Sequence, residues 1–312
     1  MTKFLGILVA VLLSLISLDM LFFERSSKND TNEDKTRVED INLSSILQES
    51  LPSESVDFEK STNKILPVEK KESPVSKKVF INSFKKPTLL IIMDDISHIN
   101  EAKAIKKLKL KIVPSILPKT KNHPNTPKIA KMFKSVMIHL PLEAVSFSKP
   151  EQNTILVSDT KKVISKKLDK ALKDFDNIVA INNHTGSKFT ANKDVLAYLL
   201  SQIEKKSYLF IDSKTTYKSK YDEIQSEKGK KIFHRDIFLD NIQKISYIKN
   251  QIKKAVILAK KQGFVIAICH PHPITFKALN RSRKLLKSVR LVDIDEIQDT
   301  KIGRVTKTVK GD

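Results

Sequence analysis

The stretch Phe264–Pro273, FVIAICHPHP, decides the fold of this chain. Small and apolar residues run without interruption and end at two histidines that one proline separates. A short continuous apolar run bounded by turn residues is typical of a strand that is buried on both faces. Side chains that follow such a strand lie at its carboxyl end, where parallel α/β folds build their ligand sites. The stretch therefore predicts a buried parallel strand with a histidine pair at its functional end.

The same pattern recurs on both sides of this stretch, and amphipathic, lysine-rich stretches separate most of the apolar runs. Continuous apolar strands that alternate with helices predict an α/β fold with a parallel sheet. Seven or eight such units predict a closed or nearly closed (β/α) barrel, and an open doubly wound sheet is the alternative. No glycine-rich phosphate loop follows the first run, which disfavours the nucleotide-binding form of that sheet. The predicted strands are Leu89–Met93, Ile112–Leu117, Val136–Leu142, Ile178–Ile181, Tyr208–Ile211, Ile232–Leu239, Phe264–Ile268 and Val289–Ile294.

Residues 1–23 have a different character. Lys3 is followed by an apolar run of about 20 residues, which is long enough to cross a bilayer core. No convincing small-x-small cleavage site follows, so we expect a signal anchor, with a cleaved signal peptide and a secreted form as the alternative. Because few residues precede the run, we expect the remaining chain on the periplasmic side of the inner (cytoplasmic) membrane.

The composition divides the remaining chain into three parts. Residues 24–86 are rich in Ser, Asn, Asp, Glu and Lys and have too few apolar residues to bury a core, which predicts a flexible linker. Residues 87–299 carry the strand–helix pattern and are expected to form a single domain. Residues 300–312 are basic and aperiodic, which predicts a loose tail.

The formal net charge of +22 comes mostly from lysine, because only seven of the 57 basic residues are arginine. The lysines are spread over nearly every predicted helix and are not clustered with aromatic residues. Nucleic-acid sites favour arginine for bidentate contacts, so we expect no nucleic-acid partner. Solvated helix faces explain the charge, and weak attraction to an anionic envelope polymer or membrane surface is the alternative. The single cysteine, Cys269, is expected to be a small buried strand residue.

Acidic and histidine side chains end several of the predicted strands. Asp94-Asp95 closes the first strand, His184 the fourth and His270-Pro271-His272 the seventh. A barrel brings these ends together around one mouth, and this convergence predicts a divalent-metal hydrolase site. Taken alone, the aspartate pair is better explained by a solvated turn with a helix cap, whereas a stray histidine near a helix start is an equal alternative for His184.

The residue types suggest roles within such a site. One aspartate of the pair can bind a metal while the other acts as a base, and His184 can be a ligand. Of the two histidines around Pro271, one can bind metal and the other can protonate a leaving group or stabilise an oxyanion. His139 lies early in its strand and is expected to be buried. Residues expected to contact substrate or support the site are Glu143, Asn183, Ser187, Asp212, Ser213, Arg235 and Asp240.

Taken in order, the strand-end motifs resemble those of the divergent polysaccharide deacetylase family. The resemblance covers about residues 87–297, roughly two thirds of the chain. It implies the distorted (β/α) barrel of polysaccharide deacetylases and a metal-dependent carbohydrate deacetylase, usually with zinc. The motifs that carry it are Met93–Asp95, Pro141–Glu143, Asn182–Ser187, Phe210–Ser213, Arg235–Asn241 and His270–Thr275.

Carried over by motif, the resemblance implies that Asp95, His184 and His270 bind the metal, most often Zn²⁺. It makes Asp94 the base and His272 the acid. Ordinary polysaccharide deacetylases have a second histidine within one helical turn of the first. None follows His184 at that spacing, so the implied site is arranged differently from theirs.

The implied reaction removes an N- or O-acetyl group from an envelope or extracellular glycan through attack of a metal-bound water on the acetyl carbonyl. Two alternatives stay open. One is a non-catalytic envelope protein that binds a glycan or a protein on the same barrel. The other is a different metal hydrolase, such as an esterase or phosphoesterase. The absence of a focused arginine cluster argues against phosphate chemistry.

Overall fold

The computed structural model describes residues 76–81, 86–146, 149–298 and 303–308. The predicted signal anchor and most of the predicted linker lie outside the described residues, so both stay predictions. Within the described residues, no helix combines the length and the apolar character that crossing a membrane requires.

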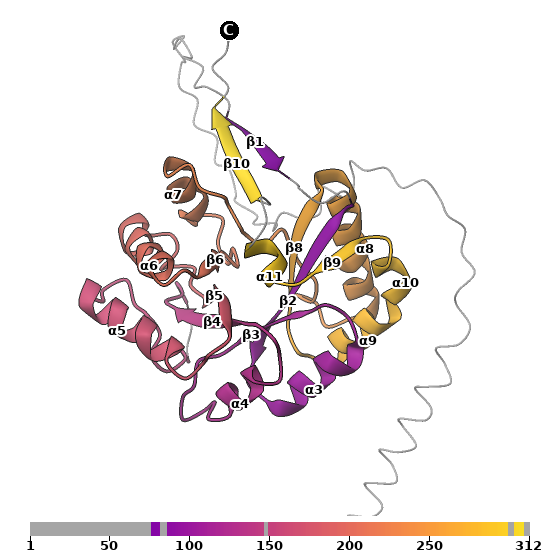
Figure 1. The fold of residues 1–312 in the computed structure, drawn as a ribbon, viewed down its shortest axis with the longest axis horizontal. Helices are drawn as coiled ribbons and strands as arrows, with labels where there is room; N and C mark the ends of the chain where they lie inside the picture. The colour runs from indigo at the N-terminus through magenta and orange to yellow at the C-terminus, as the bar shows by residue number, and fades with distance from the viewer. Residues whose placement is uncertain (1–75, 82–85, 147–148, 299–302, 309–312) are drawn as a thin grey trace, which may run out of the picture. The chain divides into compact units, whose positions relative to one another are not determined.

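The main sheet confirms the predicted α/β class with parallel strands. Its order is β6-β5-β4-β3-β2-β8-β7, with β9 paired to β2, and each of these neighbouring pairs is parallel. Figure 1 labels these strands except β7. Its strands are β2 (Thr88–Ile96), β3 (Val113–Ile116), β4 (Val136–Leu142), β5 (Ile178–Thr185), β6 (Leu209–Ile211), β7 (Ile237–Phe238), β8 (Phe264–Cys269) and β9 (Arg290–Val292).

The seven strands of this order form a half-barrel with β6 and β7 at its two ends. An isolated parallel bridge between Asp212 and His234 joins the end of β6 to the segment that leads into β7. The Asp212 amide donates to the Phe233 carbonyl at 3.0 Å, and the Arg235 amide donates to the Asp212 carbonyl at 2.9 Å. Within the described residues, these few contacts between the end of β6 and the segment before β7 are what closes the predicted barrel.

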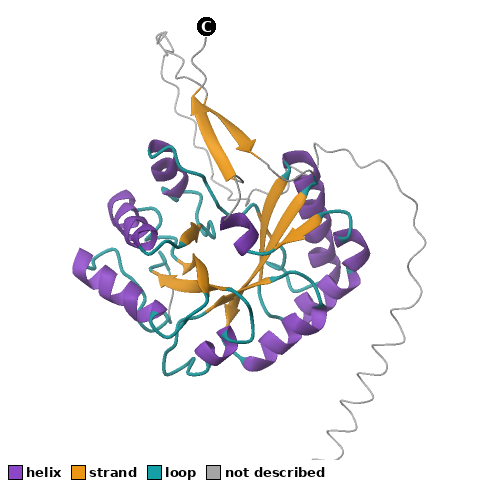
Figure 2. Ribbon diagram, in the orientation of Figure 1, coloured by secondary structure: helices purple, strands orange, loops and turns teal. Residues whose placement is uncertain are grey.

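The helices lie around the outside of the strands (Figure 2). Helix α6 shows why the lysine-rich stretches fold this way: Leu196, Leu199, Leu200 and Ile203 recur at helical spacing and are buried, and the Asn192 side chain caps the first turn. The helices are α3 (Ile99–Leu108), α4 (Thr126–Ala130), α5 (Lys161–Leu172), α6 (Lys193–Lys205), α7 (Tyr221–Glu227), α8 (Ile245–Gln262), α9 (Pro273–Arg281), α10 (Arg283–Leu286) and α11 (Asp295–Gln298).

Strand β2 explains the continuous apolar runs of the sequence. Leu89 and Ile91 join a large buried cluster that includes many helix residues, whereas Leu90 and Ile92 join a smaller cluster built mostly from strand residues. Because alternate side chains enter two different cores, neither face of the strand can be polar. Each of these four side chains is at most 1% exposed, and burial of one such side chain contributes roughly 1.5–3 kcal/mol.

Two further strands pair outside the main sheet. Strand β1 (Ser76–Ile81) runs antiparallel to β10 (Gly303–Thr308), with Ser76 opposite Thr308 and Ile81 opposite Gly303. The composition predicted a flexible linker through residue 86 and a loose tail from residue 300, and no regular structure in either. A pairing between segments from the two ends of the domain leaves little trace in the local composition of either one.

Candidate metal centre

The two aspartates at the end of β2 both face His139. Asp95 is held at a φ of 59°, and the register between β2 and β3 shifts between Met93 and Ile96. This local turn out of the strand brings two adjacent carboxylates to one site. The His139 Nε2 atom lies 3.6 Å from Asp94 Oδ2 and 3.2 Å from Asp95 Oδ1. A left-handed φ at a non-glycine residue costs about 1–3 kcal/mol, and such strain is concentrated at functional sites.

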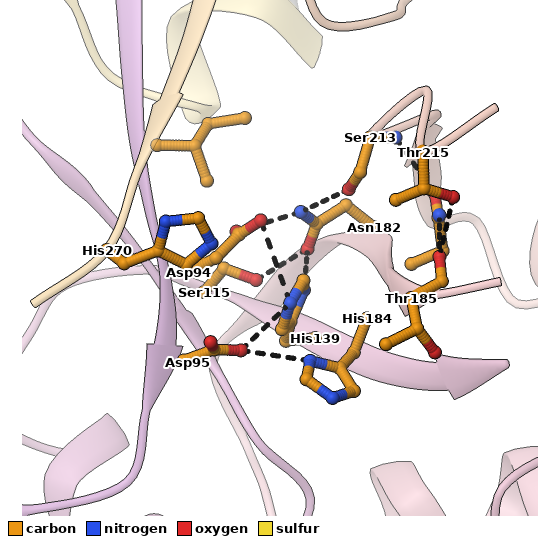
Figure 3. A network of polar contacts seen from close by, with 12 residues as sticks. Asp94, Asp95, Ser115, His139, Asn182, His184, Thr185, Ser213, Thr215 and His270 are labelled. Carbon is orange, nitrogen blue, oxygen red and sulfur yellow. Dashed lines mark hydrogen bonds and ion pairs between the residues drawn. The ribbon is translucent and has the colours of Figure 1, made fainter. Parts of the chain in front are cut away.

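Strands β4 and β5 supply the two histidines that meet Asp95. The register pairs His139 with Asn182 and Pro141 with His184, so the side chains of His139, Asn182 and His184 share one face of the sheet. His184 Nδ1 lies 2.9 Å from Asp95 Oδ1 (Figure 3). His139 is only 3% exposed, so it is buried as expected, but it is buried inside the site.

The group Asp95–His139–His184 fits a divalent metal. One potential ligand atom from each residue lies within 4.8 Å of the others. Donor atoms around a tetrahedral zinc ion are about 3.3 Å apart, which follows from bond lengths of about 2.0–2.1 Å. The two contacts made by Asp95 Oδ1, at 2.9 and 3.2 Å, are close to this spacing. Three protein ligands would leave a fourth position for substrate or water, and the 38% exposure of the Asp95 side chain shows that solvent reaches the group.

Asn182, which the sequence analysis did not select, connects this group to its surroundings. Its Oδ1 accepts hydrogen bonds from Ser115 Oγ at 2.5 Å and from His139 Nδ1 at 3.1 Å. Its Nδ2 donates to Asp94 Oδ1 at 2.9 Å and to Ser213 Oγ at 3.0 Å. Because the amide oxygen takes the Nδ1 proton of His139, Nε2 is left either to donate a hydrogen bond to Asp95 or, without its proton, to offer its lone pair to a metal.

The electrostatics separate the two aspartates. Burial raises the pKa of Asp94 above its ordinary value, although His139 and His270 oppose the shift. Burial would also raise the pKa of Asp95, but hydrogen bonds from His139 and His184 outweigh it and hold this pKa well below its usual range. Burial would lower the pKa of His139, and the two carboxylates raise it instead. Asp95 is therefore the permanent anion, and Asp94 is the carboxylate that can exchange a proton.

His270 belongs to a second group, with Asp240 and His272. The Asp240 carboxylate is fully buried and lies 3.0 Å from His270 Nδ1. Its Oδ2 accepts from the His270 amide at 2.7 Å and from Thr275 Oγ1 at 2.8 Å. Burial would lower the pKa of His270, but the Asp240 hydrogen bond and charge raise it to about 9.

The predicted ligand set Asp95–His184–His270 is thus divided between two groups. Strand β8 lies on the side of β2 away from β4 and β5, so His270 approaches Asp94 from the side opposite His184 (Figure 3). In the group that contains Asp95 and His184, the third potential ligand is His139. His272, the predicted acid, is exposed, and its ring centroid lies 6.1 Å from that of His270.

Arg235 and Ser213 hold the loop after β6. Arg235 donates to the carbonyl oxygens of Ser213 and Lys214, each at 2.8 Å, and burial lowers its pKa to about 10. Its guanidinium carbon lies 3.8 Å from the centroid of the Phe238 ring, which in turn stacks on His270 at 6.1 Å. Arg235 therefore supports both sides of the site through backbone and ring contacts.

The remaining predicted site residues are engaged within the protein. Glu143 accepts from Lys188 Nζ and from the Val157 amide, both at 2.7 Å. Asn183, on the opposite face of β5 from Asn182, accepts from the Ser213 amide at 2.8 Å. Ser187 Oγ accepts from the Val145 amide at 3.0 Å, and Asp212 accepts from Ser219 Oγ at 2.7 Å and from the Lys214 amide at 2.8 Å. Cys269 is buried as expected, and burial raises its thiol pKa well above its ordinary value.

A family model for divergent polysaccharide deacetylases matches residues 91–298, which include both side-chain groups. The chain belongs to this family. An uncharacterized protein of Haemophilus influenzae is similar to it, with 30% identity over 218 residues that cover 69% of this chain and 78% of that protein. YibQ of Escherichia coli, also uncharacterized, is 33% identical over 146 residues, covering 47% of this chain and 46% of YibQ.

A solved structure shares the fold. The crystal structure of the uncharacterized protein ATU2773 from Agrobacterium tumefaciens superposes with a TM-score of 0.63 at 16% identity, covering 70% of this chain and 91% of that one. At this identity the similarity concerns the fold alone. The fold is thus also found in a protein of low sequence identity to this chain.

Proposed function

We propose that this divergent polysaccharide deacetylase is a metal-dependent hydrolase that removes acetyl groups from an envelope or extracellular glycan. One observation carries the proposal. A carboxylate–histidine–histidine group, Asp95–His139–His184, lies beside a buried carboxylate, Asp94, and an aspartate-oriented histidine, His270, approaches Asp94 from the other side. This arrangement supplies a metal site, a base and an acid around one position.

The first group would hold the metal through Asp95 Oδ1, His139 Nε2 and His184 Nδ1. Two imidazoles and one carboxylate favour Zn²⁺ among the common divalent ions, with one coordination position left for chemistry. A divalent ion in this group supplies Lewis acidity, which polarises an acetyl carbonyl and lowers the pKa of water.

Asp94 is suited to accept the proton of the attacking water. Its Oδ1 is held by the Asn182 amide, and its Oδ2 faces the same His139 Nε2 atom that approaches Asp95. Burial raises its pKa from the ordinary aspartate value toward the working pH, which makes a carboxylate a better base.

His270 is suited to donate a proton to the leaving amine or alcohol. Asp240 occupies its Nδ1, so the proton available for transfer is on Nε2. The stacked Phe238 ring and the three hydrogen bonds to Asp240 fix the plane of the imidazole. We therefore assign the acid role to His270 and a peripheral position to His272.

Metal content and acetate release together test this assignment. His139→Ala should abolish stoichiometric metal binding and acetate release from N- and O-acetylated oligosaccharides. His270→Ala should keep the metal and lower the rate of acetate release by about 10²–10⁴-fold. His123→Ala is the matched control, because His123 pairs with Glu151 at 3.1 Å and belongs to neither metal-binding group.

Two results would contradict the proposal. If His270→Ala loses the metal while His139→Ala still binds it fully, the ligands are the ones that the sequence predicted, Asp95, His184 and His270. A wild-type chain that takes up no divalent ion and releases no acetate would favour a non-catalytic glycan- or protein-binding role.

A further inference from the structure

Exposed hydrophobic side chains gather at the carboxyl end of the strands. Within the described residues, the large hydrophobic side chains that are exposed are Ile99, Val145, Val163, Tyr217 and Ile242. All except Val163 follow the carboxyl ends of strands β2, β4, β6 and β7 within a few residues. Single exposed hydrophobic residues are ordinary on protein surfaces, but their concentration around the mouth that holds the candidate metal centre indicates a binding rim.

Tyr217 is the most exposed of them, at 86%, and its loop is firmly held. At the start of this loop, Ser213 Oγ accepts from Asn182. Thr215 Oγ1 donates to the carbonyl of Thr185, next to His184, at 3.0 Å (Figure 3). At the far end, Ser219 Oγ donates to the buried Asp212 at 2.7 Å. The aromatic ring is therefore presented to solvent by a loop that is tied to the strands of the site, and ordering this loop adds little cost on binding.

Lys218 places a cation beside this ring. Its Nζ lies 5.6 Å from the centroid of Tyr217. Neighbouring lysines are paired: Lys214 lies 3.3 Å from Asp222, and Lys220 lies 3.0 Å from Glu223. For the Lys218 amine, the described part of the chain offers the Tyr217 ring and no carboxylate within ion-pair distance. The Lys218 amine is therefore open to pair with an anion of a bound ligand.

We propose that Tyr217 and Lys218 form a sugar subsite at the mouth, where one pyranose ring of a carboxylate-bearing glycan stacks on Tyr217 and its carboxylate pairs with Lys218. The proposal rests on the proposed function, because it names the substrate of that site. The C–H groups on one face of a pyranose carry partial positive charge and match the negative face of an aromatic ring. A tyrosine offers this area with little loss of side-chain entropy.

The pattern of the rim favours a glycan over a protein partner. Tyr217 lies between Thr216 and Lys218, and Ile242 lies between Asn241 and Gln243, so apolar and hydrogen-bonding groups alternate. Protein interfaces bury a contiguous apolar core, whereas a sugar offers an apolar face edged by hydroxyl groups. The alternation of the rim matches the second kind of surface.

Equilibrium binding tests the subsite without requiring turnover. The probes are an acetylated tetrasaccharide with a carboxylate on alternate sugars and the methyl ester of the same tetrasaccharide, titrated into the full chain by calorimetry. Tyr217→Ala should weaken binding of both probes by about tenfold, whereas Tyr217→Phe, which keeps the ring, should stay within about twofold of wild type. Lys218→Gln should weaken binding of the acid by roughly fivefold and leave binding of the ester unchanged.

Lys228→Gln, at the end of α7, is the matched charge control and should bind both probes as wild type does. The subsite is wrong if Tyr217→Ala binds as tightly as wild type, if Lys218→Gln weakens both probes equally, or if wild type binds neither probe. Because binding is measured directly, a chain that binds the acid through Tyr217 but releases no acetate would refute the proposed hydrolysis and leave the subsite standing.

Discussion

Replacement of Asn182 by alanine tests whether the polar network around Asn182 positions the metal centre. Asn182 is 0% exposed and uses its whole hydrogen-bonding capacity, with two bonds accepted by Oδ1 and two donated by Nδ2. In Asn182→Ala, the His139 Nδ1 proton and one Asp94 oxygen would lose their buried partners. The variant should therefore lose both stability and metal affinity.

The expected magnitudes follow from these contacts. Four hydrogen bonds at about 1 kcal/mol each give a loss of roughly 4 kcal/mol in the free energy of unfolding. For a domain of this size, such a loss lowers Tm by roughly 8–16 °C. Loss of a residue that orients a metal-binding histidine typically weakens metal affinity by about 10–100-fold. Thermal unfolding of the metal-free chain and zinc competition with a chromophoric chelator measure the two effects separately.

Asn183→Ala is the matched control, because the chain offers the same residue type one position away and equally buried. Asn183 accepts from the Ser213 amide and donates to the Thr185 carbonyl at 2.6 Å, on the opposite face of β5. Asn183→Ala should cost about 2 kcal/mol and leave zinc affinity within a fewfold of wild type. Equal zinc affinities for Asn182→Ala and wild type, or equal losses in both variants, would refute the positioning role.

Three further predictions follow from the same geometry. Asp94→Asn should keep the metal and lower acetate release by about 10²–10⁴-fold; loss of metal, measured by elemental analysis, would exchange the roles of the two aspartates. The folded-state pKa of His270, raised to about 9 from 6.5, should appear in an NMR titration and fall toward 6.5 in Asp240→Asn. The stability that this pair contributes is fully present below about pH 6.5 and is lost as pH rises through about 9, so denaturation midpoints of wild type and Asp240→Asn should converge at high pH. Gly186→Ala should destabilise the fold by about 1–3 kcal/mol, because φ is +97° and a Cβ would meet side-chain atoms at 3.1 and 3.2 Å. In the control Gly229→Ala, with φ +60° and no atom within 4 Å of the Cβ, urea midpoints should shift less.

Much of the architecture could be predicted from local pattern. The apolar runs of β2 and β8 indicated strands with both faces buried, and the two clusters that divide Leu89 from Leu90 confirm it. The arrival of Asp94, Asp95 and His184 at one mouth also followed from the pattern, because parallel strands place their carboxyl ends at one edge. Burial on two faces and a common strand direction are properties of each segment, so they are visible in the sequence.

Tertiary structure decided which residues belong to the candidate metal group. His139 meets Asp95 because the β4–β5 register pairs it with Asn182, and because Asp95 turns out of its strand at a positive φ. A shift of one residue in that register would bring Asn183 to the site in place of Asn182. The sequence had led us to expect Asn183 there. The separation of His270 from the other histidines has a similar origin, since β8 and β4 lie on opposite sides of β2. Residue types and strand ends were determined by the sequence alone, whereas strand order, register and one backbone angle depend on contacts between distant segments, which no local pattern encodes.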